Sequence, residues 1–404
     1  MLNVTFTLEA YKRIHNQRFI FAAILTLLYP VIIFANLLII YVISMERSLH
    51  KPMYILICNL ACINLYGGSS LAPFVVANII TGTFQISWIG CLVQIFSFNT
   101  YGGCEIMNLM MMAYDRYISI CFPLTYGKLM SPLNVMICII LIWLIPFSRA
   151  AITLSITASL QICGNVIEKI YCDNYSVVKL ACSDTTSNNI YSTIVTFYSV
   201  LLPFFIIIYS YIRIIFICLQ LTRKGRTKLM NTCMPHIVSI TSFFIGCAFE
   251  LFQSRFDLTH VPYTVRVILS LYFLILSPIL NPVIYGAKTE KINETIKTKI
   301  SNHLLDICSE YGVEFDVQNV LLGLRRKITG LFVYTQSMTK VGEYSDWEWT
   351  DYVHPDSFHG CADWKLLELC MGLFTGALLC RAAVTPPAEV LYVPPGLPPV
   401  EALT

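Results

Sequence analysis

Charged side chains are scarce in this sequence of 404 residues. Only 13% of the residues are Asp, Glu, Lys or Arg, whereas 56% are hydrophobic and the mean hydropathy is +0.67. Soluble proteins average about 25% charged residues, so this scarcity argues against a water-soluble chain, and it excludes a disordered one over the first 300 residues. Long basic stretches are also lacking, because Lys and Arg lie in short clusters between uncharged runs. That pattern argues against nucleic acid as a partner.

The uncharged runs are long enough to cross a bilayer, which takes roughly 20 apolar residues per helix. We expect seven spans, and the chain is therefore an all-α membrane protein built as a seven-helix bundle. The spans are expected at residues 19–45, at two runs within 52–115 separated by a polar turn near 81–85, and at 133–158, 190–212, 233–249 and 267–287. Membrane lipid is then a partner of the chain.

The loops indicate the orientation, because cytoplasmic loops carry an excess of Lys and Arg. With the N-terminus outside, the inner segments hold 13 of these residues and the outer ones 8, and 223–228 is the densest inner cluster. Residues 1–18 lack the apolar core of a cleavable signal peptide, so we expect the first helix to act as its own insertion signal. Glycosylation motifs at Asn3 and Asn174 would then lie outside, and the motif at Asn293 inside.

Motifs at the helix ends narrow the choice between a receptor, a transporter and an intramembrane enzyme. They are LHKPMY at 49–54, MAYDRYISIC at 112–121, SY at 210–211, NTCMPH at 231–236 and NPVIY at 281–285. In this order and spacing, the set resembles the odorant receptors of the rhodopsin-like G-protein-coupled receptor family, most closely the fish branch, across roughly residues 15–300. The resemblance implies a non-enzymatic receptor in the plasma membrane of olfactory cilia. Its implied partners are a small odorant and an olfactory stimulatory G protein that activates adenylyl cyclase.

Several of these motif residues suit a switch. Asp115 can hold the Arg116 guanidinium at the inner end of the third span, and a released Arg116 could meet backbone carbonyls of an inserted partner helix. Asn281-Pro282 removes a helix hydrogen bond and permits a bend, and Tyr285 could swing one turn later. The resemblance implies a role in G-protein coupling for the whole set. It comprises Asp115, Arg116, Tyr117, Tyr211, Asn281, Pro282 and Tyr285.

Glu105 lies ten positions before Asp115, about 15 Å along the helix at 1.5 Å per residue. A carboxyl group at that depth must be protonated, paired or bound to a cation. The family often places a second acid on the second helix, and the pair helps to hold sodium, whereas Asn64 occupies that position here. We therefore expect at most a weak sodium site, with Asn36, Asn64, Glu105 and Asn281 sharing a polar network.

Four cysteines lie in the expected outer segments, namely Cys91 at the start of the third helix and Cys163, Cys172 and Cys182 in the second outer loop. An oxidising exterior favours pairing, and four cysteines allow three connectivities. In the resembling receptors one bond ties the third helix to this loop and another closes the loop on itself. The resemblance thus implies Cys91–Cys172 and Cys163–Cys182, with Cys91–Cys182 as the alternative.

We expect the ligand between the helices in the outer half of the bundle. Gly102 and Gly103 would open volume there, although glycines also permit close helix packing. The expected lining is Phe98, Asn99, Gly102, Gly103, Tyr198, Gly246, Phe249 and Tyr272. This set contains no charged side chain, which predicts a neutral or weakly polar odorant.

Three regions divide the chain: an extracellular N-terminus at 1–18, the receptor domain at 19–300, and a cytoplasmic tail at 301–404. The receptor domain is expected to end in a short amphipathic inner helix at 288–299 that lies on the membrane surface. The tail carries 6 Lys and Arg against 13 Asp and Glu, whereas residues 1–300 carry 21 against 11. The resemblance does not cover the tail, which we expect to be disordered or joined to the receptor by an erroneous gene model.

A non-olfactory rhodopsin-like receptor is the nearest alternative function. A transporter is more remote, because the sequence shows no inverted repeats. An intramembrane enzyme lacks the paired catalytic residues it would need at depth.

Overall fold

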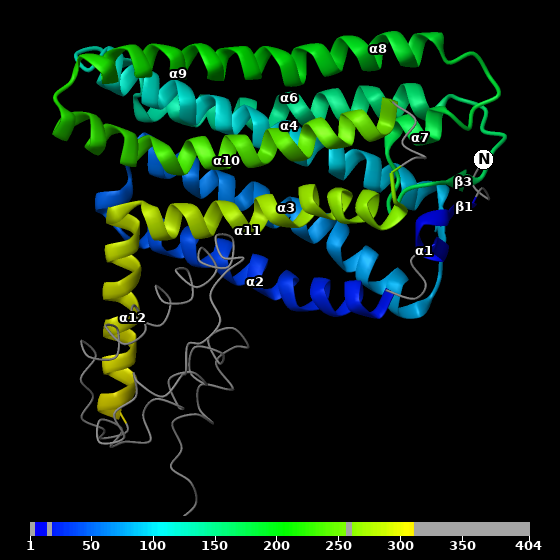
Figure 1. The fold of residues 1–404 in the computed structure, drawn as a ribbon, viewed down its shortest axis with the longest axis horizontal. Coiled ribbons are helices and arrows are strands. Elements are labelled where there is room, and N and C mark those ends of the chain that lie inside the picture. The colour runs from blue at the N-terminus through cyan, green and yellow to red at the C-terminus, as the bar shows by residue number, and fades with distance from the viewer. Residues whose placement is uncertain (1–4, 14–17, 256–260, 311–404) are drawn as a thin grey trace, which may run out of the picture. The chain divides into compact units, whose positions relative to one another are not determined.

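Seven long helical segments run alongside one another in the computed structural model (Figure 1), which describes residues 5–13, 18–255 and 261–310. They are α2 (Arg18–Met45), α3 (Pro52–Thr81), α4 (Trp88–Cys121), α6 (Pro132–Ala158), α8 (Thr186–Thr196) continued by the π-helical segment η3 (Phe197–Leu201) and α9 (Leu202–Gln220), α10 (Arg223–Arg255) and α11 (Tyr263–Lys288). The shorter helices are α1 (Glu9–Arg13), the 3₁₀ turn η2 (Arg47–Leu49), α5 (Tyr126–Leu129) and α7 (Asn174–Val178).

Local sequence fixes where several of these helices begin and end. Pro52 opens α3, where a missing N–H costs nothing, and Ser87 and Ser131 cap α4 and α6 through their side-chain oxygens. Gly82 ends α3 with a φ of 67°, a left-handed conformation that glycine adopts without strain. The expected polar turn near 81–85 is therefore confirmed.

Five of the described helical segments are long and apolar enough to cross a membrane, and α11 adds a sixth when its two bent halves are joined. The remaining span is α4, whose hydropathy is lowered by buried polar residues such as Gln94, Glu105 and Asn108. It packs against α3, α6 and α9. This helix with buried polar residues thus lies at the centre of the bundle, where its polar groups find protein partners instead of lipid.

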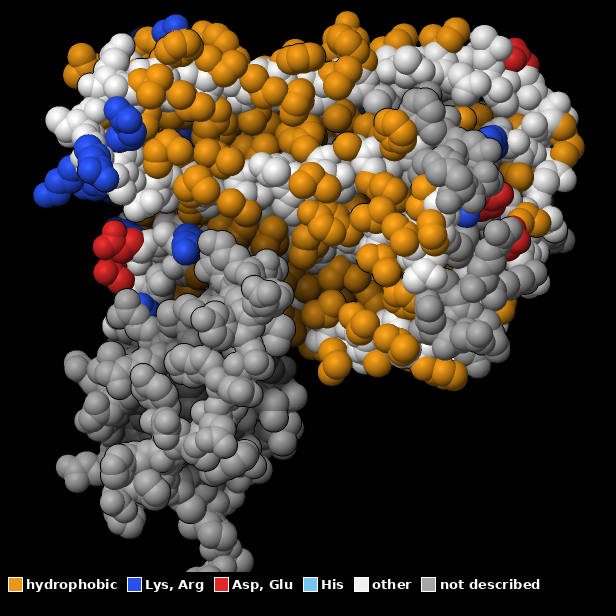
Figure 2. Space-filling view, in the orientation of Figure 1, with side chains coloured by type: hydrophobic (Ala, Val, Ile, Leu, Met, Phe, Trp, Pro, Cys, Tyr) orange, Lys and Arg blue, Asp and Glu red, His pale blue; other side chains and the backbone are white. Residues whose placement is uncertain are grey.

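Apolar side chains also cover the outside of the bundle. Leu144, Phe205 and Ile268 are about half exposed, and hydrophobic side chains spread over the face in Figure 2, as a lipid-facing surface requires. Lys and Arg gather at the end where α9 gives way to α10, which begins with the cluster at 223–228.

A small sheet not expected from the sequence lies at the opposite end of the bundle. Its strands, in the order β2-β1-β3, are β1 (Thr5–Leu8), β2 (Gln85–Ser87) and β3 (Val166–Ile167). β1 pairs antiparallel with β2 and parallel with β3. Phe6 and Leu8 are fully buried, and the Tyr11 hydroxyl donates to the Ile170 carbonyl at 2.7 Å. The sheet joins the N-terminal segment to the loops after α3 and α6.

After α11 the chain enters α12 (Glu290–Glu310), longer than the amphipathic helix expected near 288–299. The Lys291 amine donates to the Ser48 carbonyl at 2.8 Å, and Ile292 is fully buried. The chain divides into two compact units, Met1–Thr298 and Lys299–Thr404. Only the end of α12 represents the second unit. Residues 301–310 of the expected tail belong to this helix, and the rest of the tail, residues 311–404, lies outside the described residues.

Candidate functional site

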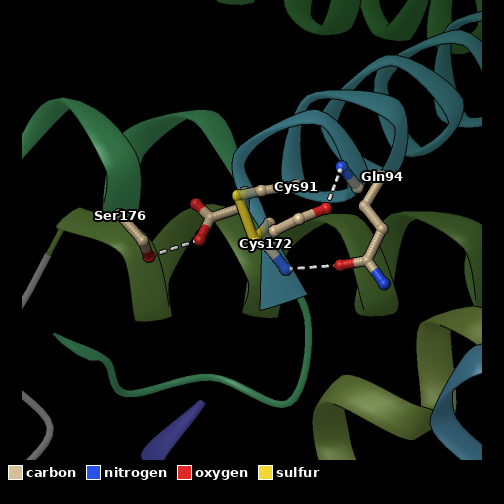
Figure 3. The surroundings of a disulfide bond; sticks show 7 residues. Cys91, Gln94, Cys172 and Ser176 are labelled. Carbon is tan, nitrogen blue, oxygen red and sulfur yellow. Dashed lines mark hydrogen bonds between the residues drawn. A yellow bond between two sulfur atoms is a disulfide. The ribbon is translucent and has the colours of Figure 1, made fainter. Parts of the chain in front are cut away.

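Two disulfides hold the end of the bundle that carries the small sheet, called here the disulfide end. Cys91 at the start of α4 pairs with Cys172, and Cys163 pairs with Cys182 within the loop between α6 and α8. These are the pairs implied by the resemblance. The Gln94 side chain accepts a hydrogen bond from the Cys172 amide at 2.9 Å, which fixes the loop one turn further along α4 (Figure 3).

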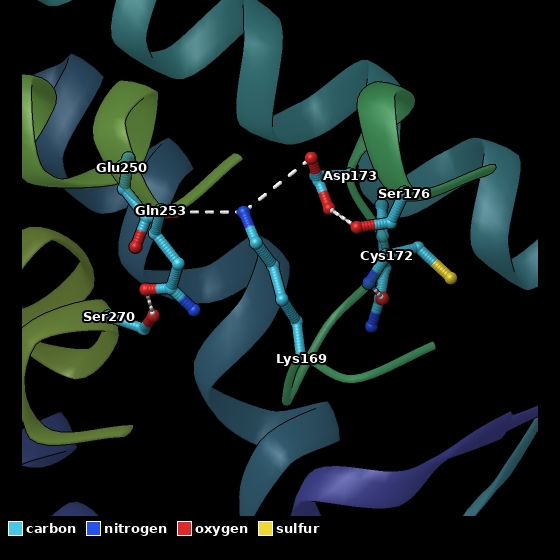
Figure 4. Close-up of polar contacts among 8 residues, drawn as sticks. Lys169, Cys172, Asp173, Ser176, Glu250, Gln253 and Ser270 are labelled. Carbon is cyan, nitrogen blue, oxygen red and sulfur yellow. Dashed lines mark hydrogen bonds and ion pairs between the residues drawn. The ribbon is translucent and has the colours of Figure 1, made fainter. Parts of the chain in front are cut away.

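The same loop carries a buried ion cluster. The Lys169 amine lies 3.5 Å from the Asp173 carboxylate and 3.3 Å from the Glu250 carboxylate, which projects from α10 (Figure 4). Burial by itself would lower the pKa of the Lys169 amine, but the two carboxylates outweigh it and raise that pKa above its ordinary value. The amine therefore stays charged and ties the loop to α10.

A cavity of about 150 Å³ lies beneath this loop, between α4, α6, α8, η3, α10 and α11. Its floor and walls include Phe98, Ile106, Phe243 and Phe273, and the rings of Phe98 and Phe273 are 5.4 Å apart. A cavity of this size suits a small molecule rather than a drug-sized one.

Of the eight residues expected to line a ligand pocket, the structure brings Phe98, Asn99, Gly102 and Gly103 to this cavity. The two glycines differ. A Cβ on Gly103 would lie 2.8 Å from Pro146, so Gly103 serves close packing of α4 against α6, whereas a Cβ on Gly102 would meet Phe273 only at ordinary contact distance, 3.6 Å.

Tyr198 does not line the cavity and is 62% exposed. It lies in η3, where π-helical turns add a residue and rotate the following side chains relative to an unbroken α-helix. Ser199 and Val200 face the cavity in its place. A prediction that assumes an unbroken α-helix through residues 190–212 therefore places the wrong face of this helix towards the cavity.

Gly246, Phe249 and Tyr272 also lie away from the cavity lining. A Cβ on Gly246 would meet the Phe273 ring at 2.9 Å, so this glycine allows α10 and α11 to approach closely. The Tyr272 hydroxyl lies 3.3 Å from the Ser242 hydroxyl, which directs it to α10.

The expected uncharged lining is wrong, because Arg149 and Glu250 both border the cavity. Arg149 lies within α6, nine residues before its end at Ala158, and the packing of α6 against α4 turns it inward. Its Nη2 donates to the Asn99 carbonyl at 2.8 Å. The hydroxyls of Ser192 and Ser199 add polarity to the same cavity.

The network expected around Glu105 is present. The Asn281 amide donates to the Glu105 carboxylate at 3.1 Å and to the Asn64 side-chain oxygen at 3.4 Å, and Asn64 donates to Asn36 at 3.1 Å. Ser277 is a further donor to Glu105 that the sequence analysis missed. The network joins α2, α3, α4 and α11 midway along the bundle.

Asn36 has a second role in this network. Pro282 lacks the N–H that would bond to the carbonyl of Pro278, four residues earlier. The Asn36 amide donates to that carbonyl at 2.9 Å. A side chain from α2 thereby compensates for the hydrogen bond that α11 loses at its Asn-Pro sequence.

At the end opposite the disulfides, called here the Asp115 end, the expected ion pair is formed. The Arg116 Nη2 lies 3.3 Å from the Asp115 carboxylate, whose side chain is fully buried. The Tyr126 hydroxyl in α5 donates to the other Asp115 oxygen at 2.8 Å. Burial, and then the Asp115 charge, raise the pKa of Tyr126, which keeps its donor proton.

Tyr211 of α9 and His236 of α10 are hydrogen-bonded next to this pair. The other ring nitrogen of His236 lies 3.1 Å from the Leu109 carbonyl of α4. His236 is thus a buried link between three helices, and the described residues contain no cluster of metal ligands around it. Tyr285 is also fully buried, and Tyr117 contacts the Tyr209 ring with centroids 5.9 Å apart.

Comparison with known proteins agrees with this arrangement. A family model described as olfactory receptor matches residues 25–303. The chain belongs to the olfactory receptor family. It is 31% identical to human olfactory receptor 14J1 over 76% of this chain and 96% of that protein, and 34% identical to human olfactory receptor 10A6 over 71% and 90%. It is 32% identical to mouse olfactory receptor 5AP2 over 70% of this chain and 89% of that protein.

This olfactory receptor is a multi-pass protein of the plasma membrane and a G-protein-coupled receptor, not an enzyme. The resemblance to the fish branch stays a prediction, since the relatives named above are mammalian.

Of the two expected glycosylation sites of this olfactory receptor, the structure describes only Asn174. The Asn174 amide nitrogen, which would carry a glycan, donates to Asn188, and its oxygen accepts from Thr157. Asn174 is half-buried and borders the cavity, so its position speaks against a glycan there. Asn3 lies outside the described residues.

Proposed function

We propose that this receptor binds a small odorant in the cavity near the disulfide end and activates an olfactory stimulatory G protein at the Asp115 end. The cavity supports the first part, since it combines aromatic walls with a few polar groups, as small-molecule sites do. The disulfides support an outward-facing position for that end, because such bonds persist in oxidising compartments. The basic start of α10 at the other end suits the cytoplasmic side.

The proposed coupling between ligand binding and the G-protein site rests on α10, which borders the cavity and also reaches the Asp115 end. Phe243 and Cys247 border the cavity, and His236, two turns from Phe243 on the same helix, is bonded to Tyr211 and to the Leu109 carbonyl. A ligand that prefers a shifted position of α10 would therefore favour a state with altered contacts around His236.

The Asp115–Arg116 pair gives the shift a chemical consequence. In the arrangement described, Asp115 holds the guanidinium against its own helix. When α10 moves away, the planar donor fork of Arg116 becomes available to backbone carbonyls of a docking helix of the G protein. Ligand binding would then shift the receptor population from a paired state, in which Asp115 holds Arg116, to an open state, in which Arg116 is available to the G protein.

A ligand screen tests this function. Cells carrying the olfactory stimulatory G protein and this receptor are exposed to an odorant panel, and cyclic AMP is measured together with surface expression. We expect at least one odorant to raise cyclic AMP through the receptor and Arg116→Ala to abolish the response at unchanged expression. A response that survives Arg116→Ala, or no response to any odorant from a well-expressed receptor, contradicts the proposal.

A weak sodium site at Glu105 is a second part of the proposal. Glu105 is the one acid in its network, and one of its carboxylate oxygens has no hydrogen-bond partner among the described residues, which fits a single cation contact. The amide oxygens of Asn36 and Asn64 already accept hydrogen bonds, so they add little. Sodium would stabilise the paired state weakly, and Glu105→Gln should change basal cyclic AMP and remove its dependence on sodium. If expression, basal signal and sodium dependence are all unchanged, Glu105 has no such role.

A further inference from the structure

We propose that the ligand of this cavity is a small carboxylate, that is, a short apolar chain ending in one anionic group, and that Arg149 binds that group. This inference rests on the proposed function, because it names the ligand class of the same cavity. It also reverses the expectation of a neutral odorant that the sequence suggested.

Arg149 lies at an unusual depth for a cation. It is nine residues before the end of α6 at Ala158, which is about 14 Å along the helix at 1.5 Å per residue. A charged side chain inside a membrane bundle is costly unless it meets a partner, and such residues are functional candidates by default. Arg149 borders the cavity, and its guanidinium donates to the Asn99 carbonyl of α4 instead of pointing to lipid.

The protein itself gives Arg149 little compensation. Its one side-chain hydrogen bond runs from Nη2 to the Asn99 carbonyl, and no carboxylate of the described residues lies within ion-pair distance. A guanidinium has five N–H donors in a fixed fork that matches a carboxylate in a bidentate way. A neutral carbonyl satisfies one donor and leaves the charge without a counter-ion.

The position of the guanidinium is built into the neighbouring helix. A Cβ on Gly103 would lie 2.8 Å from Arg149 Nη2 and 2.8 Å from Pro146, so a side chain at position 103 would displace the guanidinium. Gly103 and the Asn99 carbonyl, one turn apart on α4, together hold Arg149 at the cavity edge. A cation that only extended its charge towards water would not need this close approach.

Two hydroxyl groups provide further donors for an anion. Ser192 on α8 and Ser199 on η3 border the cavity, and neither side chain makes a hydrogen bond to another described residue. Their O–H groups are therefore available to a ligand oxygen. Charge-assisted hydrogen bonds of this kind are shorter and stronger than neutral ones.

Glu250 borders the same cavity and would by itself repel an anion. Its carboxylate lies 3.3 Å from the Lys169 amine, which it shares with Asp173, so the Lys169 charge compensates Glu250 only in part. Arg149 has no equivalent acidic partner among the described residues. The two charged groups at the cavity are therefore not equivalent, and the cation is the one left for a ligand.

The rest of the cavity limits the ligand to a short apolar chain. Phe98, Phe243 and Phe273 supply aromatic walls, and the volume of about 150 Å³ suits a molecule of about six or seven non-hydrogen atoms. A carboxylate with a short alkyl chain places its charge at Arg149 and its chain against these rings.

A matched series of five-carbon probes tests the inference in cells that express the full receptor with its G protein. The probes are pentanoate, pentan-1-ol, pentanamide and pentylamine, alongside a panel of neutral odorants, with cyclic AMP as readout. We expect pentanoate to act at a concentration at least tenfold lower than the alcohol or the amide. Equal or better activity of the alcohol, the amide or the amine overturns the inference without any variant being needed.

Substitutions then locate the contact. Arg149→Gln should raise the half-maximal concentration of pentanoate at least tenfold, and Arg149→Lys, which keeps the charge without the fork, should raise it less. Lys179→Gln is the matched control, because it removes an exposed positive charge from the same end of the receptor, outside the cavity lining. If Arg149→Gln and Lys179→Gln shift the response equally at normal surface expression, Arg149 does not bind the ligand.

A binding measurement separates this inference from the proposed function. The detergent-solubilised full chain is heated with and without pentanoate, and its unfolding midpoint is followed. Stabilisation of the unmodified receptor but not of Arg149→Gln supports the inference even if no cyclic AMP signal is found. If neutral odorants signal while pentanoate neither signals nor stabilises, the function stands and the inference fails. If no probe signals or stabilises, both fail.

Discussion

The two ends of the helix bundle are closed by different kinds of interaction. At the disulfide end, two covalent bonds, a three-stranded sheet and the buried Lys169 cluster hold the loops and the N-terminal segment in place. At the Asp115 end, the closing contacts are one ion pair and hydrogen bonds from Tyr126 and between Tyr211 and His236.

We expect this difference to separate stability from signalling. Covalent bonds do not open on the timescale of a signal, whereas an ion pair and hydrogen bonds worth about 1 kcal/mol each exchange readily. We therefore expect substitutions at the disulfide end to change stability more than basal signalling, and substitutions at the Asp115 end to do the reverse. Substitutions at the two ends can test this expectation.

Removing the Cys91–Cys172 bond should have the largest effect. The bond joins residues 81 positions apart, so Cys91→Ser should lower the free energy of unfolding by about 4 kcal/mol, against about 3 kcal/mol for Cys163→Ser, whose bond spans 19 positions. Thermal unfolding of the detergent-solubilised receptor measures this. Cys138→Ser, at a half-buried free cysteine, is the control and should change little. Equal losses for all three substitutions would contradict the order.

Lys169→Met should come next. It leaves Asp173 and Glu250 buried without the shared amine and should cost about 3 kcal/mol, with the exposed Lys179→Met as control. Because the pKa of Lys169 is raised, its contribution is complete below the ordinary lysine value of about 10.4 and is lost only as the pH rises through the higher folded value. Unfolding midpoints between pH 6 and 9 should therefore show no loss from this group, and a loss in that window would show the amine to be uncharged.

Asp115→Asn changes the Asp115 end and should affect basal signalling more than stability. It removes the charge that holds Arg116 at 3.3 Å, and a loss of about 1 kcal/mol shifts the equilibrium about fivefold towards the open state. Basal cyclic AMP should rise accordingly, with little change in the unfolding midpoint. Asp184→Asn, at an exposed carboxylate of the disulfide end, should leave the basal signal alone. A large stability loss without a rise in basal signal would contradict the expected difference between the two ends.

Tyr126→Phe should give a smaller change of the same kind. It removes one donor to Asp115 at 2.8 Å but leaves the ion pair in place. We expect a two- to threefold rise in basal cyclic AMP, about 0.5 kcal/mol. Tyr198→Phe, at an exposed ring, is the matched control. A rise as large as that of Asp115→Asn would mean that the hydroxyl, not the charge, controls the switch.

Truncation after residue 310 should have the smallest effect. The family match ends at residue 303, so the receptor domain is complete before that point. The shortened chain should keep its surface expression and its ligand response within about twofold, as measured by cyclic AMP. Loss of signalling at normal expression would show that the tail takes part.

The contacts of the candidate site could be predicted where they depend on the type of a residue and its depth in the membrane. Glu105 and Asn281 were expected in one network because a carboxyl group at mid-membrane must find polar neighbours, and the structure joins them at 3.1 Å. The Asp115–Arg116 pair follows from adjacency in the chain. Arg149 and Tyr198 were misplaced, because the face on which a side chain lies depends on helix packing and on the π-helical segment before α9.

The amino-acid sequence alone indicates the seven spans, several helix ends, the family and the pairing of Asp115 with Arg116. Apolar runs and terminal motifs encode these locally, since each helix satisfies its own backbone hydrogen bonds within the membrane. Three features depend on the packing of distant segments: β1 joins two loops in a sheet, Lys169 contacts Glu250, and Arg149 borders the cavity. These contacts join residues far apart in the chain, so no local sequence pattern predicts them. In a chain with few charged residues, they place the charge of Arg149 beside the cavity.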